Sequence, residues 1–394
     1  MRPGQEPAWP VVAPAIFEQD GSMTLLGDFT SASLMEKRSF KMAAKTGEAR
    51  RHSVTTGPEY IYRPKMISSP DSVGVLLGGL AYGVDTCGDM AYVACINYVA
   101  MMHLATRKVL AKVSVPGTAL SLTASPSGKA VYVACQEGGL VILGREADDS
   151  LTIAETHNVP ALGVAMCMAK PVAVVACDSL GLCLFDTRTH SWISMIALHH
   201  ALGQYKARSV AIKDDQYAIV ACDAGFLAVV DIVDPKHPRL VSIDRVFTGE
   251  ARSISLDDDN TTAYVACGNK GIYIVNIVDV EAIKSLGHVK SAYGAVFDVK
   301  VFGSLLLCAC QIGGLAVFTV TNEKPYLRLV GQNNRFEGIC HGVAGFNVRS
   351  SYGSHSREAL VTCQSGGIQV IKLDRMEAWP QPLKPALGEA CSIM

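Results

Sequence analysis

The chain has 394 residues, of which 49% are hydrophobic, and its 35 basic residues balance 36 acidic ones. A net charge near zero gives no sign of the extended basic surface that nucleic-acid-binding proteins present. No apolar run reaches the roughly 18 residues of a membrane-spanning helix, and the first residues lack the basic start and apolar core of a secretory leader. We therefore expect a cytoplasmic protein without a nucleic-acid partner, in which the 13 cysteines stay reduced.

Residues 1–71 show no repeat and few strand signals, so we expect an irregular N-terminal extension. Between Ser31 and Lys65, eight basic residues stand against three acidic ones, which predicts a mobile basic arm. The motif RRHS in this arm resembles the target of basophilic protein kinases and makes Ser53 a candidate for phosphorylation. So short a motif also arises by chance.

One pattern then recurs seven times, an apolar β-branched run that ends in a cysteine. The cysteines follow one another at intervals of 40 to 53 residues, and they are Cys95, Cys135, Cys177, Cys222, Cys267, Cys310 and Cys363. Periods in the forties indicate repeated supersecondary units.

Each repeat has the pattern of four strands. After the cysteine, a short glycine-containing turn leads to a second apolar run, as in CGNKGIYIVNIVD, which is typical of a hairpin. One strand precedes this hairpin, as in SISLDDDNTTAYVAC, and another follows it, as in RLVSIDRV. Seven such units without helical periodicity predict an all-β fold, a seven-bladed β-propeller of four-stranded blades that bury both faces against their neighbours.

A propeller must close its ring, and the last repeat lacks its fourth strand. The segment after Asp374, RMEAWPQPLKP, contains three prolines, which disfavour a strand. The stretch SVGVLLGG, residues 72–79, stands where the outer strand of a preceding blade belongs, so we expect it to complete the last blade and remove the exposed edges. The chain then divides into the extension 1–71, a propeller 72–375, and a flexible proline-containing tail 376–394.

Two segments, GFLAVVDIVDPKHPRLVS and CGNKGIYIVNIVD, carry a family resemblance. They resemble the LVIVD repeat, in which a turn glycine, a Leu-x-Ile-Val-Asp strand and Asp-Pro-x-x-Pro precede an outer strand. Other repeats keep part of this pattern, and the first, CINYVAMMHLAT, lacks the glycine. The resemblance implies a propeller and little about function. WD40 and kelch propellers are less favoured, because the three tryptophans form no Trp-Asp pairs and the kelch aromatic pattern is missing.

The repeated cysteines raise the question of a metal site. Blades pack about 10 Å apart, far beyond the roughly 2.3 Å of a zinc–sulfur bond. We therefore interpret each repeated cysteine as a small hydrophobic residue between blades. Two close pairs, Cys177 with Cys183 and Cys308 with Cys310, are minor candidates for oxidation.

The sequence assigns no residue to catalysis, to a metal or to another cofactor. His199 and His200 have no evident third ligand for zinc. The acidic run from Asp257 to Asn260 occupies a turn, where such residues favour the backbone bend. The chain has no glycine-rich phosphate loop, no nucleophile elbow and no HExxH motif.

Propellers usually bind through one end of their central channel. Alignment of the innermost strands places one residue of each repeat at this mouth, and these are Tyr82, Leu120, Leu162, Arg208, Arg252, Phe297 and His341. The candidates for binding a ligand or a protein partner are Tyr82, Arg208, Arg252, Phe297 and His341. Two arginines on adjacent blades beside aromatic rings would hold a carboxylate, a phosphate or an acidic peptide. The alternative is that both are solvated or pair with acidic side chains such as Glu250.

The last four residues, CSIM, fit the C-a-a-X prenylation motif, and the final methionine favours a farnesyl group on Cys391. The prolines favour an extended tail that a prenyltransferase can reach. One farnesyl chain binds membranes only marginally, and the basic arm would supply a second attraction. Phosphorylation of Ser53 would weaken that attraction.

These patterns predict a non-enzymatic protein-interaction scaffold, cytoplasmic and peripherally attached to a membrane through its lipid. The alternative is a ligand-binding or enzymatic propeller that uses the cationic and aromatic mouth. That alternative predicts a deep polar pocket at the mouth, ideally with a carboxylate or a histidine such as His341 placed as a base, whereas a flat or apolar mouth favours the scaffold.

Overall fold

The computed structural model describes residues 80–200, 203–290, 294–333, 338–349, 355–364 and 367–373, together with Leu77 and four short strands before it. The chain divides into two compact units, Met1–His52 and Ser53–Met394. In the first unit, β1 (Ala15–Phe17) and β2 (Met23–Leu25) pair as an antiparallel hairpin. The seven repeats all lie in the second unit.

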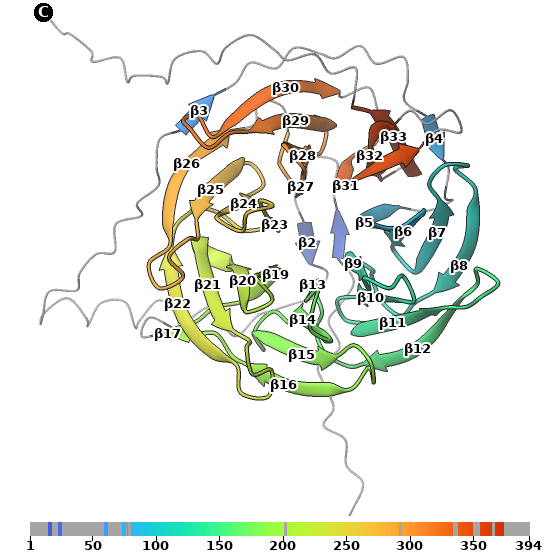
Figure 1. Cartoon of the computed structure of the whole chain (residues 1–394), viewed down its shortest axis with the longest axis horizontal. Helices are drawn as coiled ribbons and strands as arrows, with labels where there is room; N and C mark the ends of the chain where they lie inside the picture. The colour runs from blue at the N-terminus through green and yellow to red at the C-terminus, as the bar shows by residue number, and fades with distance from the viewer. Residues whose placement is uncertain are drawn as a thin grey trace, which may run out of the picture. The chain divides into compact units, whose positions relative to one another are not determined.

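The second unit is a ring of seven sheets, and each sheet forms one blade (Figure 1). The expected all-β, seven-bladed propeller with four-stranded antiparallel blades is therefore confirmed for the described residues. In blades 1 to 6 the four strands of a repeat follow one another in chain order from the channel outward. The repeat and the blade thus coincide.

The strands occupy equivalent places in successive blades. The innermost strands are β5 (Ala81–Cys87), β9 (Ser121–Ala124), β13 (Gly163–Met166), β19 (Ala207–Lys213), β23 (Ser253–Leu256), β27 (Asp298–Phe302) and β31 (Cys340–Arg349). The second strands are β6 (Met90–Cys95), β10 (Ala130–Ala134), β14 (Val172–Ala176), β20 (Tyr217–Cys222), β24 (Thr262–Ala266), β28 (Leu305–Ala309) and β32 (His355–Cys363). The third strands are β7 (Tyr98–His103), β11 (Leu140–Arg145), β15 (Leu182–Asp186), β21 (Phe226–Asp231), β25 (Ile272–Asn276), β29 (Leu315–Val320) and β33 (Gly367–Lys372).

The outer strands complete the blades. They are β8 (Val109–Ser114), β12 (Leu151–His157), β16 (Trp192–Ile196), β22 (Arg239–Arg245), β26 (Lys284–Lys290), β30 (Leu327–Asn333) and, in blade 7, β4 (Val73–Val75). Two small elements lie in connections, the pair β17 (His199–His200) and β18 (Gly203–Gln204), and the 3-10 turn η2 (Asp223–Gly225).

The second strand of each blade is the most deeply buried. In β6, β10 and β14 every residue is buried, because neighbouring blades cover both faces of the sheet and select continuous β-branched runs. The seven repeated cysteines are at most 2% exposed, which confirms that they pack between blades. The buried side chains form seven hydrophobic clusters, one at each interface between adjacent blades.

The repeated turn glycine has a steric cause. Gly181 and Gly271 adopt φ angles of 83° and 84°, in the left-handed region that favours glycine. A Cβ atom at Gly181 would also lie 2.2 Å from the Ile196 carbonyl oxygen of the outer strand. The glycine therefore lets the hairpin approach the fourth strand.

The ring closes through an N-terminal strand, as expected. Strand β4 pairs with β33 in an antiparallel register that places Val75 opposite Ile368. The described strand is Val73–Val75, the first part of the stretch that the sequence indicated. The Tyr98 hydroxyl and the Lys112 ammonium of blade 1 both donate hydrogen bonds to the Leu77 carbonyl, which fixes the chain as it passes from blade 7 to blade 1.

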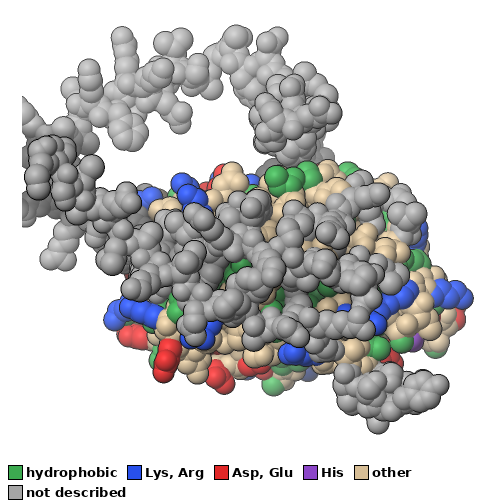
Figure 2. All heavy atoms as spheres, turned by 90° about the horizontal axis from the view of Figure 1, so that it is seen from above, with side chains coloured by type: hydrophobic (Ala, Val, Ile, Leu, Met, Phe, Trp, Pro, Cys, Tyr) green, Lys and Arg blue, Asp and Glu red, His purple; other side chains and the backbone are tan. Residues whose placement is uncertain are grey.

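A further strand extends blade 5. Strand β3 (Glu59–Ile61) pairs in parallel with the outer strand β26, and Tyr60 lies opposite Val289. No sequence pattern indicated this contact. The edge-on view shows acidic and basic side chains together on the visible rim of the propeller (Figure 2).

Candidate functional site

The channel of the propeller forms a cavity of about 930 Å³ that all seven blades line. At one end lie the seven aligned residues, each next to the first residue of its innermost strand, and every one of them lines the cavity: Tyr82, Leu120, Leu162, Arg208, Arg252, Phe297 and His341. The structure thus brings the five candidate residues to one mouth. The alignment of the repeats was sufficient to find them, because equivalent residues of the repeats occupy equivalent places in the blades.

Three aromatic side chains at the mouth form a continuous series of ring contacts. The His341 ring lies 4.7 Å from the Tyr82 ring and 5.1 Å from the Phe297 ring, between centroids. The Arg252 guanidinium continues the series at 5.7 Å from the Phe297 centroid, within the range of a cation–π contact. Blades 1, 7, 6 and 5 therefore share one arc, which we call the mouth arc, and it comprises Tyr82, His341, Phe297 and Arg252.

Both mouth arginines have acidic neighbours. Arg252 lies 3.3 Å from Glu250, and Arg208 on the next blade lies 3.4 Å from Asp178. The pairing with Glu250 that the sequence left open is therefore present. The side chains of Arg252 and Arg208 remain 53% and 35% exposed, so their guanidiniums also face solvent.

His341 is the most strongly perturbed group at the mouth. Burial, together with the nearby Arg252 cation, lowers its pKa to about 4, so the imidazole is neutral at neutral pH. Its Nε2 atom is buried and has no hydrogen-bond partner within the described part of the chain. A group with this pKa is a weak base near pH 7, but it can donate or accept a hydrogen bond.

One residue deeper, adjacent blades approach each other so closely that several positions need small side chains. A Cβ atom at Gly342 would lie 2.3 Å from the Tyr82 carbonyl oxygen, and one at Gly83 would lie 2.7 Å from that of Leu120. Six of the seven equivalent positions are accordingly glycine or serine. We call this set the narrow ring, and its members are Gly83, Ser121, Gly163, Ser209, Ser253, Asp298 and Gly342.

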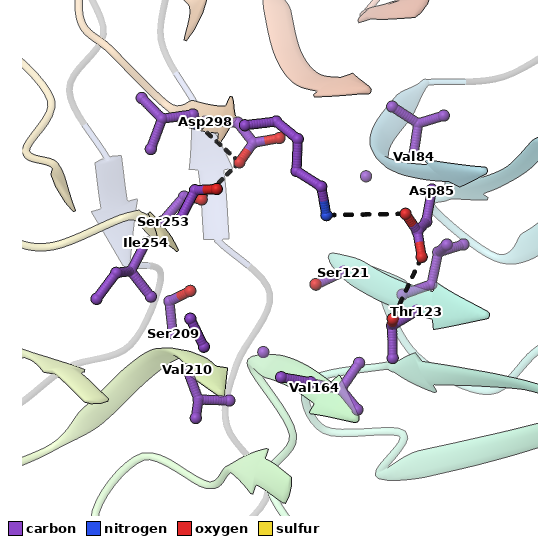
Figure 3. Close-up of a pocket in the computed structure, with 18 of the residues that line it drawn as sticks. Val84, Asp85, Ser121, Thr123, Val164, Ser209, Val210, Ser253, Ile254 and Asp298 are labelled. Carbon is purple, nitrogen blue, oxygen red and sulfur yellow. Dashed lines mark hydrogen bonds and ion pairs between the residues drawn. The ribbon is translucent and has the colours of Figure 1, made fainter. Parts of the chain in front are cut away.

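Asp298 is the exception in the narrow ring, and hydrogen bonds explain how it is held. Its carboxylate accepts from the Ser253 hydroxyl of blade 5 at 2.5 Å and from the Val343 N–H of blade 7 at 2.9 Å, as well as from the Val299 N–H of its own strand. Burial raises the pKa of Asp298. Figure 3 shows its bond to Ser253 in the channel wall. The carboxylate therefore joins three consecutive blades.

An ion pair between two blades lies deeper in the channel than the narrow ring. The Lys300 ammonium of blade 6 lies 3.9 Å from the Asp85 carboxylate of blade 1. The other carboxylate oxygen of Asp85 accepts from the Thr123 hydroxyl of blade 2 (Figure 3). It also accepts from the Ala124 N–H of the same strand. Sequence reasoning missed Asp85, Asp298 and Lys300. The aligned strand starts held a signal for Asp298 alone, since it is the one charged residue at a glycine or serine position.

The remaining candidates from the sequence are the acidic turn at Asp257 and the cysteines. Asp257 accepts hydrogen bonds from the Thr261 and Thr262 N–H groups, which confirms its turn-forming role. The cysteines of the described residues are free thiols. Cys340, which the sequence did not single out, has its sulfur 3.4 Å from that of Cys363 across the strand pair.

Several features concern only part of the chain. Among the described residues, no group of three or more histidine, cysteine or acidic side chains is arranged to hold a metal ion. That same part of the chain contains no helix with the length and apolar character needed to cross a bilayer. Ser53 and Cys391 lie outside the described residues.

Comparisons with known proteins agree with the fold. The family model of the LVIVD repeat matches residues 116–143 and 205–244, and the second match includes the segment GFLAVVDIVDPKHPRLVS. Among solved structures, the β-propeller domain of Cps50 (Swd1) from Myceliophteria thermophila is similar, with a TM-score of 0.60 and 11% identity over 76% of this chain and 98% of that chain. No curated protein sequence matches. The fold and mouth define a seven-bladed β-propeller, and two of its segments match the LVIVD repeat.

Proposed function

We propose that the protein is a non-enzymatic interaction propeller that binds an acidic segment of a partner protein at the channel mouth. The observation that carries this proposal is the mouth arc, in which three rings and a guanidinium from four consecutive blades are in contact. Arg208 stands on the next blade. Such a surface offers ring faces to an apolar or aromatic side chain and guanidiniums to a carboxylate.

The ion pairs at the mouth do not prevent this binding. The Arg252 pair with Glu250 is exposed on both sides, 53% and 67%, and exposed pairs contribute only about 0–1 kcal/mol. A partner carboxylate that binds a guanidinium in the bidentate geometry forms two charge-assisted hydrogen bonds, which are roughly twice as strong as neutral ones. The exchange of partners therefore favours an acidic ligand.

Selection from a random peptide library on the immobilised propeller tests this function. We expect the selected peptides to be rich in Asp and Glu, and we expect the double variant Arg208→Gln/Arg252→Gln to bind them at least tenfold more weakly. The matched control is Arg188→Gln/Arg239→Gln, whose arginines are also exposed and paired with aspartates. Equal binding by the wild type and the mouth variant would overturn the proposal.

We further propose that farnesylation of Cys391 recruits the propeller to a membrane. The terminal CSIM motif supports the modification, and the excess of basic residues between Ser31 and Lys65 supplies a second attraction to an anionic leaflet. Mass spectrometry of the purified tail tests the modification. Cell fractionation tests recruitment: Cys391→Ser should move to the soluble fraction, whereas Cys87→Ser, the control, should not.

The channel cavity supports a second candidate function, the binding of a small molecule. A volume of about 930 Å³ lies within the roughly 300–1,000 Å³ of small-molecule sites. A catalytic role has less support, because His341 with a pKa of about 4 is a weak base at neutral pH.

A further inference from the structure

Below the mouth, the channel wall carries polar groups with unused hydrogen-bonding capacity. The Lys300 ammonium and one carboxylate oxygen of Asp85 lie 3.9 Å apart, which is longer than a hydrogen bond. Within the residues described, Lys300 has no hydrogen-bond acceptor, and both hydrogen bonds to Asp85 reach its other oxygen. A donor and an acceptor thus face each other, and neither forms a hydrogen bond with a described residue.

Two serines of the narrow ring have the same property. Ser253 gives its hydroxyl to Asp298, but the hydroxyls of Ser121 and Ser209 form no hydrogen bond with any described residue. Both lie at the wall of the channel cavity, from blades 2 and 4 (Figure 3). With Asp85 and Lys300 they form a set on four blades, which we call the inner site.

The chemistry of the inner site selects hydroxyl groups. A hydroxyl accepts one hydrogen bond and donates another, so a single ligand hydroxyl can accept from the Lys300 ammonium and donate to the Asp85 carboxylate. Serine hydroxyls both donate and accept, so they satisfy further hydroxyls. The opposite charges of Lys300 and Asp85 cancel, which gives no preference for a charged group at this depth.

We propose that the inner site binds a small polyhydroxylated molecule, a monosaccharide or a cyclitol. The mouth residues lie three strand positions above Lys300 and Asp85, which corresponds to about 10 Å. A phosphate ester of the polyol therefore reaches toward Arg208 and Arg252, and its phosphate binds there. This second contact rests on the anion-binding role proposed for the mouth, whereas the polyol contact does not.

Ligand-detected NMR and calorimetry with four probes test the proposal: D-glucose, myo-inositol, glucose 6-phosphate and inorganic phosphate. We expect at least one polyol to bind the full-length wild-type protein at millimolar concentration. Lys300→Met should weaken this binding at least tenfold, because it keeps the length of the side chain and removes its donors. Lys284→Met, on the outer strand β26, is the matched control. Equal melting temperatures of wild type and Lys300→Met show that the fold is retained.

The possible results distinguish the inner site from the mouth. Failure of every polyol to bind the wild type, or equal binding by Lys300→Met, overturns the inner site and leaves the peptide-binding mouth untouched. The phosphorylated sugar should bind more tightly than glucose, and Arg208→Gln/Arg252→Gln should abolish this difference without affecting glucose. Binding of inorganic phosphate alone, lost in that double variant, supports the mouth as an anion site and contradicts the polyol site.

Discussion

Arg107 of blade 1 forms an ion pair with Glu358 of blade 7, and the side chain of Glu358 is only 3% exposed. The guanidinium also lies 5.7 Å from the centroid of the Phe346 ring. Arg107 and Glu358 are 251 positions apart in the chain, and they meet at the interface where the first and last blades close the ring.

Arg107→Gln should lower the free energy of unfolding by about 3–5 kcal/mol, because it leaves the Glu358 carboxylate buried without a cation. Urea unfolding measures this change. Arg188→Gln is the matched control: its ion pair is 73% exposed on the arginine side, and the expected loss is at most about 1 kcal/mol. The double variant Arg107→Gln/Glu358→Gln should recover part of the loss. Equal costs for the two arginines would contradict the prediction.

His341 should make the fold sensitive to acid. Its pKa in the folded protein is about 4, below the ordinary value of 6.5, so the unfolded chain binds the proton first. The contribution of neutral His341 to the free energy of unfolding is complete above pH 6.5. It is lost as the pH falls toward 4, a decrease of up to about 3 kcal/mol. His341→Phe should remove this part of the pH dependence in urea titrations, whereas His237→Phe, at a residue 82% exposed, should leave it nearly unchanged. Parallel pH profiles for wild type and His341→Phe would refute this account.

Replacing the glycines of the narrow ring by alanine should destabilise the fold to different degrees, in an order that the distances predict. The nearest carbonyl oxygen would lie 2.3 Å from a Cβ atom at Gly342, 2.7 Å from one at Gly83 and 3.1 Å from one at Gly163. We expect Gly342→Ala to destabilise most and Gly163→Ala least, with losses of about 1–3 kcal/mol for the tightest sites. Ser121→Ala, at an equivalent position, should change stability by at most about 0.5 kcal/mol. A reversed order in thermal or urea unfolding would show that the blades do not approach as described.

The buried cysteines should resist alkylation until the protein unfolds. Burial raises the pKa of the Cys135 thiol to about 12, and Cys222 is fully buried, so few thiolates are available to react at pH 8. Cys87 is only partly buried and should react first among the cysteines of the blades. Iodoacetamide labelling with mass spectrometry, with and without urea, measures this order. Rapid labelling of Cys135 in the native protein would contradict the packing interpretation.

Much of the fold could be predicted because each blade repeats the same local pattern. The apolar run that ends in a cysteine, and the glycine that follows it, are set by contacts within one blade and with its neighbours, so they recur and are visible in the sequence. The mouth positions were predictable for the same reason. Even the closing strand left a signal, because Asp374 is followed by prolines instead of a fourth strand.

Contacts between different repeats left no such signal. The approach of Lys300 to Asp85 depends on the width of the channel and on how far blades 6 and 1 stand apart, which no local pattern encodes. The pairing of Arg107 with Glu358 joins residues that are unremarkable in their own repeats. Strand β3 has only three residues, too few to establish a period.

The closing strand also has a consequence for how the protein is made. Strand β4 leaves the ribosome almost 300 residues before its partner β33. Until then the cluster that combines Leu77 and Val93 with Leu360 and Val370 cannot form. One face of blade 1 and the edge of β4 therefore stay exposed throughout elongation. A released chain that ends before residue 367 should accordingly bind chaperones that the chain containing β33 no longer needs.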